Sequence, residues 1–276
     1  MRILSIIRDK KWFLGALFIY GGIRVLSYVF PPGTLINTLL STGIALAASY
    51  SIFKKKHLGW IIVAGEILLG GSGGFLAIGF VSLRTALVLL SSFSYAIIYR
   101  RELRILYTNE PHVFYILGFF LATAIGAAVH GLLNHHHLAY ILGDTIPYFF
   151  VLYYFPARML YNNEHFKKAG WQLLAAAIIG NMIFTYGTFI AFSTGSEILH
   201  DQYYRWFRDV AGGKITDLGF HFFRIVLNEQ LLVAPVLVYL FGKKLFPDFR
   251  QTEKKPQHYS WHNTLFPLLA ILAVNL

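Results

Sequence analysis

The residues best suited to chemistry gather in one stretch, residues 193–230, which is also the longest break between the apolar segments of the chain. Its acids are Glu197, Asp201, Asp209, Asp217 and Glu229. Its basic and imidazole side chains are Arg205, Arg208, Lys214, Arg224, His200 and His221. A guanidinium group binds two phosphate oxygens at once, so several such groups at one surface suit a pyrophosphate. The alternative is that these cations pair with the nearby acids or extend to lipid phosphates.

Four further charged residues lie within apolar runs, where a charge is costly and usually faces protein or water. Arg24 and Arg84 lie toward one end of their runs, so we add them to the candidate anion-binding residues. Glu66 lies four residues before Gly70, the first residue of a glycine cluster. We expect Arg84 or Arg24 to pair with it, and a purely structural ion pair is the simpler reading. Asp144 is a second acid of this kind.

The histidines do not indicate a metal site. His135, His136 and His137 are consecutive, and consecutive helical residues point about 100° apart, so they cannot converge on one ion. His221 could serve as a general base, but the surrounding phenylalanines favour packing instead. No Ser-His-Asp pattern, P-loop or HExxH motif is evident. We therefore expect no metal and no nucleotide cofactor.

Composition indicates an all-α, polytopic helical membrane protein. The chain has 276 residues, of which 56% are hydrophobic and 13% charged, and its mean hydropathy is +0.55. Soluble proteins are about 45–50% apolar and about 25% charged. Several apolar runs reach the roughly 18 residues that cross a hydrocarbon core, whereas a membrane barrel would show short alternating segments. The chain has no cysteine, which excludes thiolate metal sites and cysteine nucleophiles.

The apolar runs predict about eight complete transmembrane helices in a single domain over residues 1–276, and a truncated ninth. The expected spans are residues 12–30, 34–53, two within 58–98, 112–132, 138–157, 170–192 and 229–246. The ninth begins near Leu265, and the 12 residues up to Leu276 would rise only about 18 Å. We therefore expect a longer natural chain. The N-terminal run resembles a signal peptide but lacks a small-residue cleavage site, so we expect an uncleaved first span.

The distribution of Lys and Arg predicts which side of the membrane each connection faces. With a cytoplasmic N-terminus and alternating spans, 18 of the 24 Lys and Arg residues fall on the inner side. The six outer ones are Arg24, Arg84, Arg205, Arg208, Lys214 and Arg224. Cytoplasmic loops collect Lys and Arg, so we expect residues 193–230 to face outward. The same rule explains the net charge of +11, which therefore does not indicate nucleic-acid binding.

Two groups of residues point to a family. The first is EILLGGSGG beginning at Glu66, followed by SLR ending at Arg84, and the second is GGKITDLG from Gly212 followed by FFRI from Phe222. Together they resemble bacterial membrane proteins of the O-antigen ligase/polymerase family. Asp144, which opens an aromatic span, resembles a third position. The resemblance covers about residues 58–245.

The resemblance implies an activity. Such proteins transfer or polymerise glycans carried on undecaprenyl pyrophosphate, at the outer face of the bacterial cytoplasmic membrane, without a metal or a nucleotide sugar. Arg84 and Arg224 would then bind the pyrophosphate or its glycan, and polysaccharide-assembly proteins would be partners. The family's large outer loop, with its catalytic histidine, has no counterpart before Leu276. The catalytic residue therefore stays unassigned.

Other classes of function stay open. A transporter or lipid-linked glycan flippase would use Glu66, Asp144, Arg24 and Arg84 to line a path through the membrane. A scaffold without activity of its own would act only with a partner. The aromatic side chains of residues 203–206 would stack on sugar rings in an enzyme, or form the ordinary aromatic belt of a membrane protein.

Overall fold

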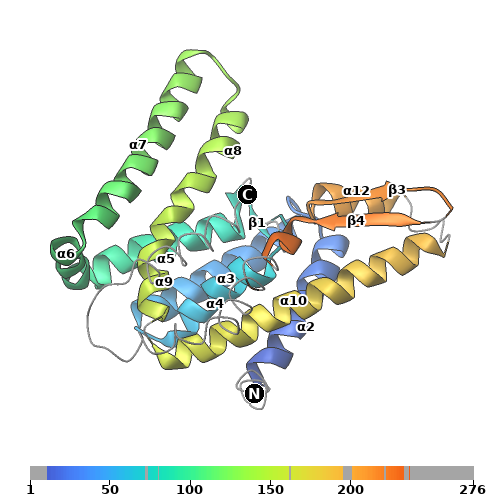
Figure 1. The fold of residues 1–276 in the computed structure, drawn as a ribbon, viewed down its shortest axis with the longest axis horizontal. Helices are drawn as coiled ribbons and strands as arrows, with labels where there is room; N and C mark the ends of the chain where they lie inside the picture. The colour runs from blue at the N-terminus through green and yellow to red at the C-terminus, as the bar shows by residue number, and fades with distance from the viewer. Residues whose placement is uncertain are drawn as a thin grey trace, which may run out of the picture.

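Four long apolar runs fold into helices, as the sequence predicts. The computed structural model describes residues 11–71, 74–79, 81–161, 163–194, 201–220, 222–232 and 236. Within these ranges, four helices are long and apolar enough to cross a membrane (Figure 1). They are Lys11–Val29 (α2), Leu35–Phe53 (α3), Pro111–Leu133 (α7) and Glu164–Ser193 (α10). This mostly helical structure is compatible with the helical membrane protein that the sequence predicts, but the described part has four such spans and not the eight expected.

Local signals set the ends of these helices. Pro31 cannot continue α2, because a proline lacks an N–H and restricts the residue before it. The Thr34 side chain accepts a hydrogen bond from the N–H of Asn37 and so begins α3. The Asn163 side chain likewise accepts from two backbone N–H groups at the start of α10.

The two spans expected within residues 58–98 are wrong as full-length helices. The structure has a 13-residue helix, His57–Leu69 (α4), and a 16-residue helix, Leu83–Ile98 (α5). At about 1.5 Å per residue they rise roughly 20 and 24 Å, less than a hydrocarbon core of about 30 Å. The short antiparallel strands Ala77–Ile78 (β1) and Val81–Ser82 (β2) lie between them. The glycine cluster explains the break, since Gly71 has a φ of +58° that other residues rarely adopt.

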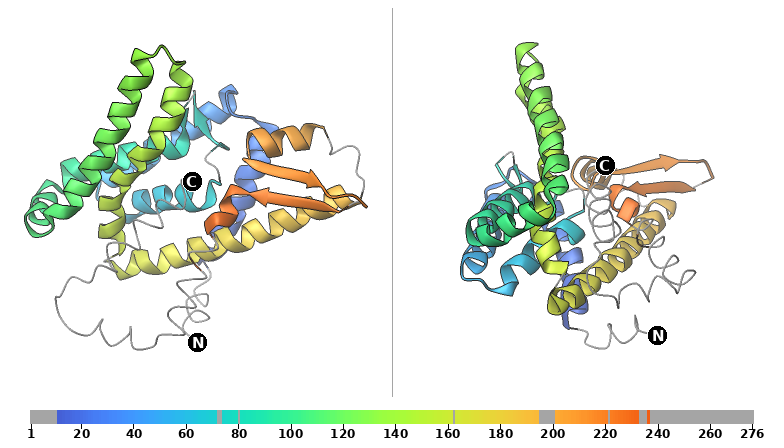
Figure 2. Two further views of the ribbon diagram at one scale, coloured as in Figure 1. Left: turned by 45° about the horizontal axis from the view of Figure 1, so that its top comes forward. Right: turned by 60° about the vertical axis from the view of Figure 1, so that its left-hand side comes forward.

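The span expected at residues 138–157 is also broken. It comprises Leu138–Phe149 (α8), the 3-10 turn Phe150–Tyr153 (η1) and Tyr154–Tyr161 (α9). Pro147 lies inside α8, where it removes a helical hydrogen bond. The charged helix Arg100–Asn109 (α6) joins α5 to α7. Figures 1 and 2 show α7 and α8 as a helical pair that projects from the other described helices.

The segment expected to face outward is not all helical. It contains the helix Gln202–Asp209 (α12), an antiparallel hairpin of Gly213–Asp217 (β3) and Phe223–Leu227 (β4), and the 3-10 turn Asn228–Leu232 (η2). Each strand contains two adjacent β-branched residues, which favour extended backbone, and Gly219 has the positive φ (+87°) that the connection requires. The hairpin lies along α10 (Figure 1). The span expected at residues 229–246 lies mostly outside the described residues, and the ninth lies entirely outside them.

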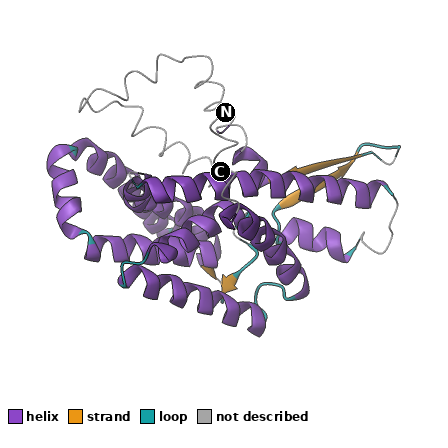
Figure 3. Ribbon diagram, turned by 90° about the horizontal axis from the view of Figure 1, so that it is seen from below, coloured by secondary structure: helices purple, strands orange, loops and turns teal. Residues whose placement is uncertain are grey.

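The main core lies between α2, α3, α4, α5 and α10, and α12 and the hairpin extend it. Figure 3 shows the two strand pairs among these helices. The approach of α2 to α10 depends on Gly180, because a Cβ there would lie 2.6 Å from a ring carbon of Tyr20. Large apolar side chains such as Phe18 and Phe119 are exposed on the outside of the helices. Exposed apolar helix faces of this kind are suited to contact with lipid.

Candidate functional site

A buried ion pair joins the two ends of the described chain. Nη2 of Arg24 in α2 donates to Oε1 of Glu229 in η2, and the Tyr20 hydroxyl donates to the other carboxylate oxygen at 2.8 Å. Nη1 of Arg24 donates to the carbonyl oxygens of Tyr20 at 3.0 Å and Leu69 at 3.3 Å. The side chains of Arg24 and Glu229 are only 4% and 5% exposed. The Arg24 guanidinium also lies 3.3 Å from the centre of the Tyr20 ring, in cation–π contact.

Arg84 is buried beside this pair and holds the glycine-rich loop. Its Nη2 donates to the carbonyl oxygen of Gly71, and more weakly to that of Glu66 at 3.5 Å. Among the described residues, the ion pair expected for Glu66 does not form. Arg84 instead binds the backbone carbonyl of Glu66, and Arg24 binds Glu229. The Glu66 carboxyl is buried, and its Oε1 has no hydrogen-bond partner. A Cβ at Gly71 would collide with Glu229 and Phe75, so only glycine fits there.

These contacts determine what the two buried arginines can bind. Arg24 directs both of its terminal nitrogens at protein acceptors, whereas Arg84 uses only Nη2, so that Nη1 and Nε of Arg84 donate to no described residue. Both arginines therefore stabilise the structure around the site, and a ligand would reach only their remaining N–H groups. The more accessible candidates lie on α12 and the hairpin.

Two of the exposed arginines are paired with acids. Arg205 contacts Asp201 at 3.3 Å, one helical turn away, and Arg208 contacts Asp209 at 2.7 Å. The hydrogen bonds from Arg208 lower the pKa of the Asp209 carboxyl below its ordinary value. Exposed ion pairs of this kind contribute little to stability, so an anionic ligand could displace either acid.

Lys214 and Arg224 share the exposed face of the hairpin. Lys214 lies opposite Val226 and Arg224 lies opposite Thr216, which makes the two cations diagonal neighbours. Diagonal neighbours in such a ladder lie about 7–8 Å apart, within reach of one ligand for long side chains. Neither side chain forms an ion pair or hydrogen bond with another described residue. Both are exposed, and the hairpin therefore presents two free cations side by side.

The opposite face of the hairpin packs against the helices and so holds the strands that carry Lys214 and Arg224. Ile215 and Leu227 are buried on it, where they pack with α12 and α10. The ring of Phe223 lies 5.7 Å from that of Phe192 in α10. Asp217 alternates to this opposite face, and its Oδ1 accepts a hydrogen bond from the Gly219 N–H. The acid of the hairpin is thus turned away from the two cations.

The aromatic residues of α12 mostly serve packing. Trp206 is buried, and its indole N–H donates to Ser27 of α2 at 3.2 Å. The Tyr203 hydroxyl lies 2.8 Å from that of Thr188 in α10. Tyr204 is half-buried and lies against Arg208, with 5.9 Å between guanidinium and ring centre. Of the three aromatics predicted to stack on sugars or form an interfacial belt, Trp206 does neither, because it fills the core.

The structure does not bring Asp144 or the histidine run into this site. Asp144 is exposed on α8, and it forms no ion pair with another described residue. His135 has a φ of +56°, and the run forms the turn between α7 and α8. In the described part of the chain, no group of three or more His, Cys, Asp or Glu residues could hold a metal ion.

Sequence reasoning missed two residues of the buried network, Glu229 and Tyr20. Glu229 was counted among the acids of residues 193–230, but its partner lies 205 residues away, which no local pattern reveals. Tyr20 had a usable signal, since it lies one helical turn before Arg24 and therefore shares its helix face. Comparison of the chain with protein-family models, curated proteins and solved structures finds no match.

Proposed function

We propose that this chain binds a pyrophosphate-linked polyprenyl glycan at the outer membrane face and takes part in its transfer or polymerisation, as in the O-antigen ligase/polymerase family. The observation that carries the proposal is the pair of unpaired cations, Lys214 and Arg224, on the exposed face of the hairpin. Two adjacent cations suit a pyrophosphate, which presents oxyanions on two phosphorus atoms. The hairpin packs on a candidate membrane-spanning helix, α10, where a lipid-linked substrate would arrive.

The chemistry assigned to these residues is electrostatic. When a glycan is transferred, the bond between the sugar and the pyrophosphate breaks, and negative charge develops on the departing phosphate oxygen. Lys214 and Arg224 would stabilise that charge. The acceptor hydroxyl must lose a proton to a base, and we assign no residue to that role. Arg24 and Arg84 would hold the loop and η2 in position beside the hairpin.

We propose a bacterial cytoplasmic membrane location with the N-terminus in the cytoplasm. In this arrangement α4 and α5 enter from the inner side and meet near the outer side at β1 and β2. The three pieces α8, η1 and α9 together complete a crossing. The connections that gather most Lys and Arg residues would then face inward, and the hairpin would face outward.

The test is glycan transfer by the full-length protein in its own cells. Arg224→Ala and Lys214→Ala should each lower transfer by about 10²-fold, the size expected when a donor to developing charge is removed. Lipid-linked precursor should then accumulate on the outer leaflet. Arg104→Ala is the matched control, since it removes an exposed arginine from α6 and should leave transfer unchanged. Normal transfer by both hairpin variants would refute the proposal.

A flippase is the second candidate, favoured by Arg24, Glu66, Arg84 and Glu229, which are four of the five charged residues buried in the described part of the chain. Buried charges among apolar helices also occur along transport paths. The same experiment separates the two functions. If Arg224→Ala leaves the precursor in the inner leaflet, the protein moves the lipid rather than transferring its glycan.

A further inference from the structure

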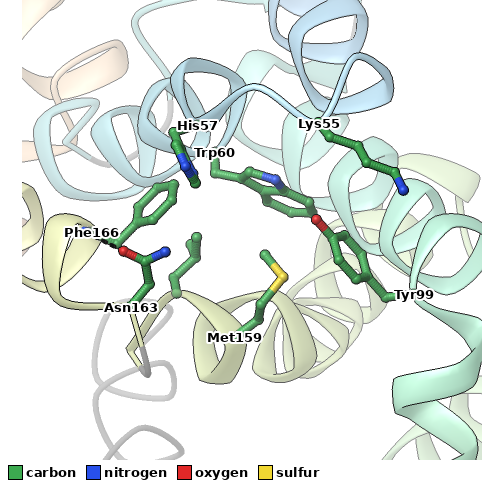
Figure 4. Close-up of a pocket in the computed structure, with 8 residues that line it drawn as sticks. Lys55, His57, Trp60, Tyr99, Met159, Asn163 and Phe166 are labelled. Atoms are coloured by element: carbon green, nitrogen blue, oxygen red, sulfur yellow. Dashed lines mark hydrogen bonds between the residues drawn. The ribbon is translucent and has the colours of Figure 1, made fainter.

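A small pocket opens at the end of the helices opposite the hairpin, away from the candidate site described above. Its volume is about 110 Å³. It is lined by Lys55, His57, Trp60, Tyr99, Met159, Leu160, Asn163 and Phe166 (Figure 4). These residues come from the turn after α3 with the first turn of α4, the residue that follows α5, α9, and the beginning of α10. Four separate segments therefore build one pocket.

The polar groups around the pocket are hydrogen-bond donors. The Oδ1 of Asn163 accepts hydrogen bonds from the N–H groups of His165 and Phe166, so the amide nitrogen is turned toward the pocket (Figure 4). The His57 ring also points inward. Trp60 is 2% exposed, and its indole N–H has no acceptor among the described residues.

The charge around the pocket favours an anion. Among the described residues no carboxylate lines it, and Lys55 lies at its edge on the side of Tyr99. Lys55 is held with a φ of +54°, an uncommon conformation for a residue other than glycine. Further cations follow along the same connections, at Lys56 and Arg100. A cation would find no counter-charge in the wall.

The volume of the pocket and its apolar side chains limit the kind of ligand that it can bind. Liquid water takes about 30 Å³ per molecule, so the pocket holds roughly four waters, close to one phosphate group and too little for a nucleotide. The side chains of Met159, Leu160 and Phe166 make one wall apolar. The pocket lies at the ends of the apolar helices α3 and α10, where the headgroups of a bilayer would be.

We propose that this pocket binds the phosphate of an anionic phospholipid, with His57, Asn163 and Lys55 as donors and the lipid chains along the apolar wall. The inference does not depend on the proposed glycan chemistry. The decisive variant is Asn163→Asp. Aspartate keeps the cap of α10, because its oxygen accepts the same backbone hydrogen bonds, but it replaces the amide donor with a carboxylate that repels phosphate.

The experiment is a titration of the purified full-length protein in detergent with dihexanoyl-phosphatidylglycerol, read by native mass spectrometry. One lipid should bind the unchanged protein. Asn163→Asp and Lys55→Gln should weaken binding about tenfold or more, as expected for loss of a charged hydrogen bond. Lys54→Gln is the matched control, because its amine lies 5.9 Å from the Tyr50 ring and does not line the pocket. Its affinity should stay within about twofold.

Three results would overturn the proposal. Equal weakening by Lys54→Gln would show attraction to general surface charge. Equal binding of dihexanoyl-phosphatidylcholine would show that the anionic headgroup is not recognised. Inorganic phosphate that binds as tightly as the lipid would identify a free-anion site instead. A melting temperature of Asn163→Asp close to that of the unchanged protein confirms that any loss of binding is not unfolding.

Discussion

At the scale of single residues, the structure separates two uses of arginine. Arg24 and Arg84 are buried and bind protein oxygens, whereas Arg224 is exposed and has no described partner. Burial explains the difference, because a buried charge must find a counter-charge or several acceptors. Their sequence positions alone placed all three among ligand-binding candidates. Only the contacts distinguish a residue that supports the site from one that is free to bind.

The buried pair of Arg24 and Glu229 predicts a specific stability pattern. Arg24→Ala should destabilise the protein by about 3–5 kcal/mol, because it leaves the Glu229 carboxylate buried without its partner. The double variant Arg24→Met with Glu229→Met should recover a large part of that loss, since it removes both charges. Unfolding in mixed detergent micelles measures these free energies.

The exposed pair of Arg205 and Asp201 provides the control for that prediction. The two side chains are 68% and 89% exposed, so Arg205→Ala should change stability by less than about 1 kcal/mol. An equally small effect of Arg24→Ala would contradict a structural role for the buried pair. The buried network would then need another explanation.

At the scale of elements, close helix contact depends on glycine at one position of α10. Gly180 faces the Tyr20 ring of α2, whereas nothing lies within 4 Å of the position of a Cβ at Gly187, two turns later in the same helix. The Tyr20 hydroxyl in turn donates to Glu229. The packing of α2 on α10 therefore positions Tyr20 so that it can bind Glu229 in the buried network.

A pair of alanine substitutions tests that contact. Gly180→Ala should destabilise by about 1–3 kcal/mol, because the added methyl group overpacks the contact with Tyr20. Gly187→Ala should leave stability unchanged or raise it by up to about 1 kcal/mol, since alanine favours helix and meets no neighbour. Thermal unfolding in detergent compares the two variants. Similar destabilisation by both would show that helix contact is not the cause.

The elements also show how far the sequence could be read. Long apolar runs predicted the bounds of their helices closely, as residues 112–132 did for α7, because such a run has few other stable forms in a membrane. The hairpin was missed, although Ile215, Thr216, Ile225 and Val226 around Gly219 are a strand-turn-strand signal. The neighbouring hydrophobic residues masked that signal. Gly71, just after α4, and Pro147, inside α8, are visible in the sequence, but they do not predict where the helices end.

At the scale of the whole molecule, the two ends of the described helices carry different groups of residues. One end carries the hairpin with Lys214 and Arg224, and the other carries the pocket with His57 and Asn163. The pocket joins the connections around residues 54–57, 99–100 and 159–166, which the charge distribution predicted to share one side. The structure thus groups these connections by contact, in agreement with the grouping by charge. Which side of a membrane each end faces is a separate matter, and it can be measured directly.

Residues 1–276 contain no cysteine, which simplifies that measurement, because any cysteine introduced is the only one among them. Leu218→Cys lies at an exposed position after β3, and Lys54→Cys lies at the opposite end. In intact cells, a membrane-impermeant maleimide should label Leu218→Cys, and it should label Lys54→Cys only after permeabilisation. The opposite pattern would place the hairpin in the cytoplasm and refute glycan transfer at the outer face. The lipid pocket would survive that result, because anionic phospholipids occur in both leaflets.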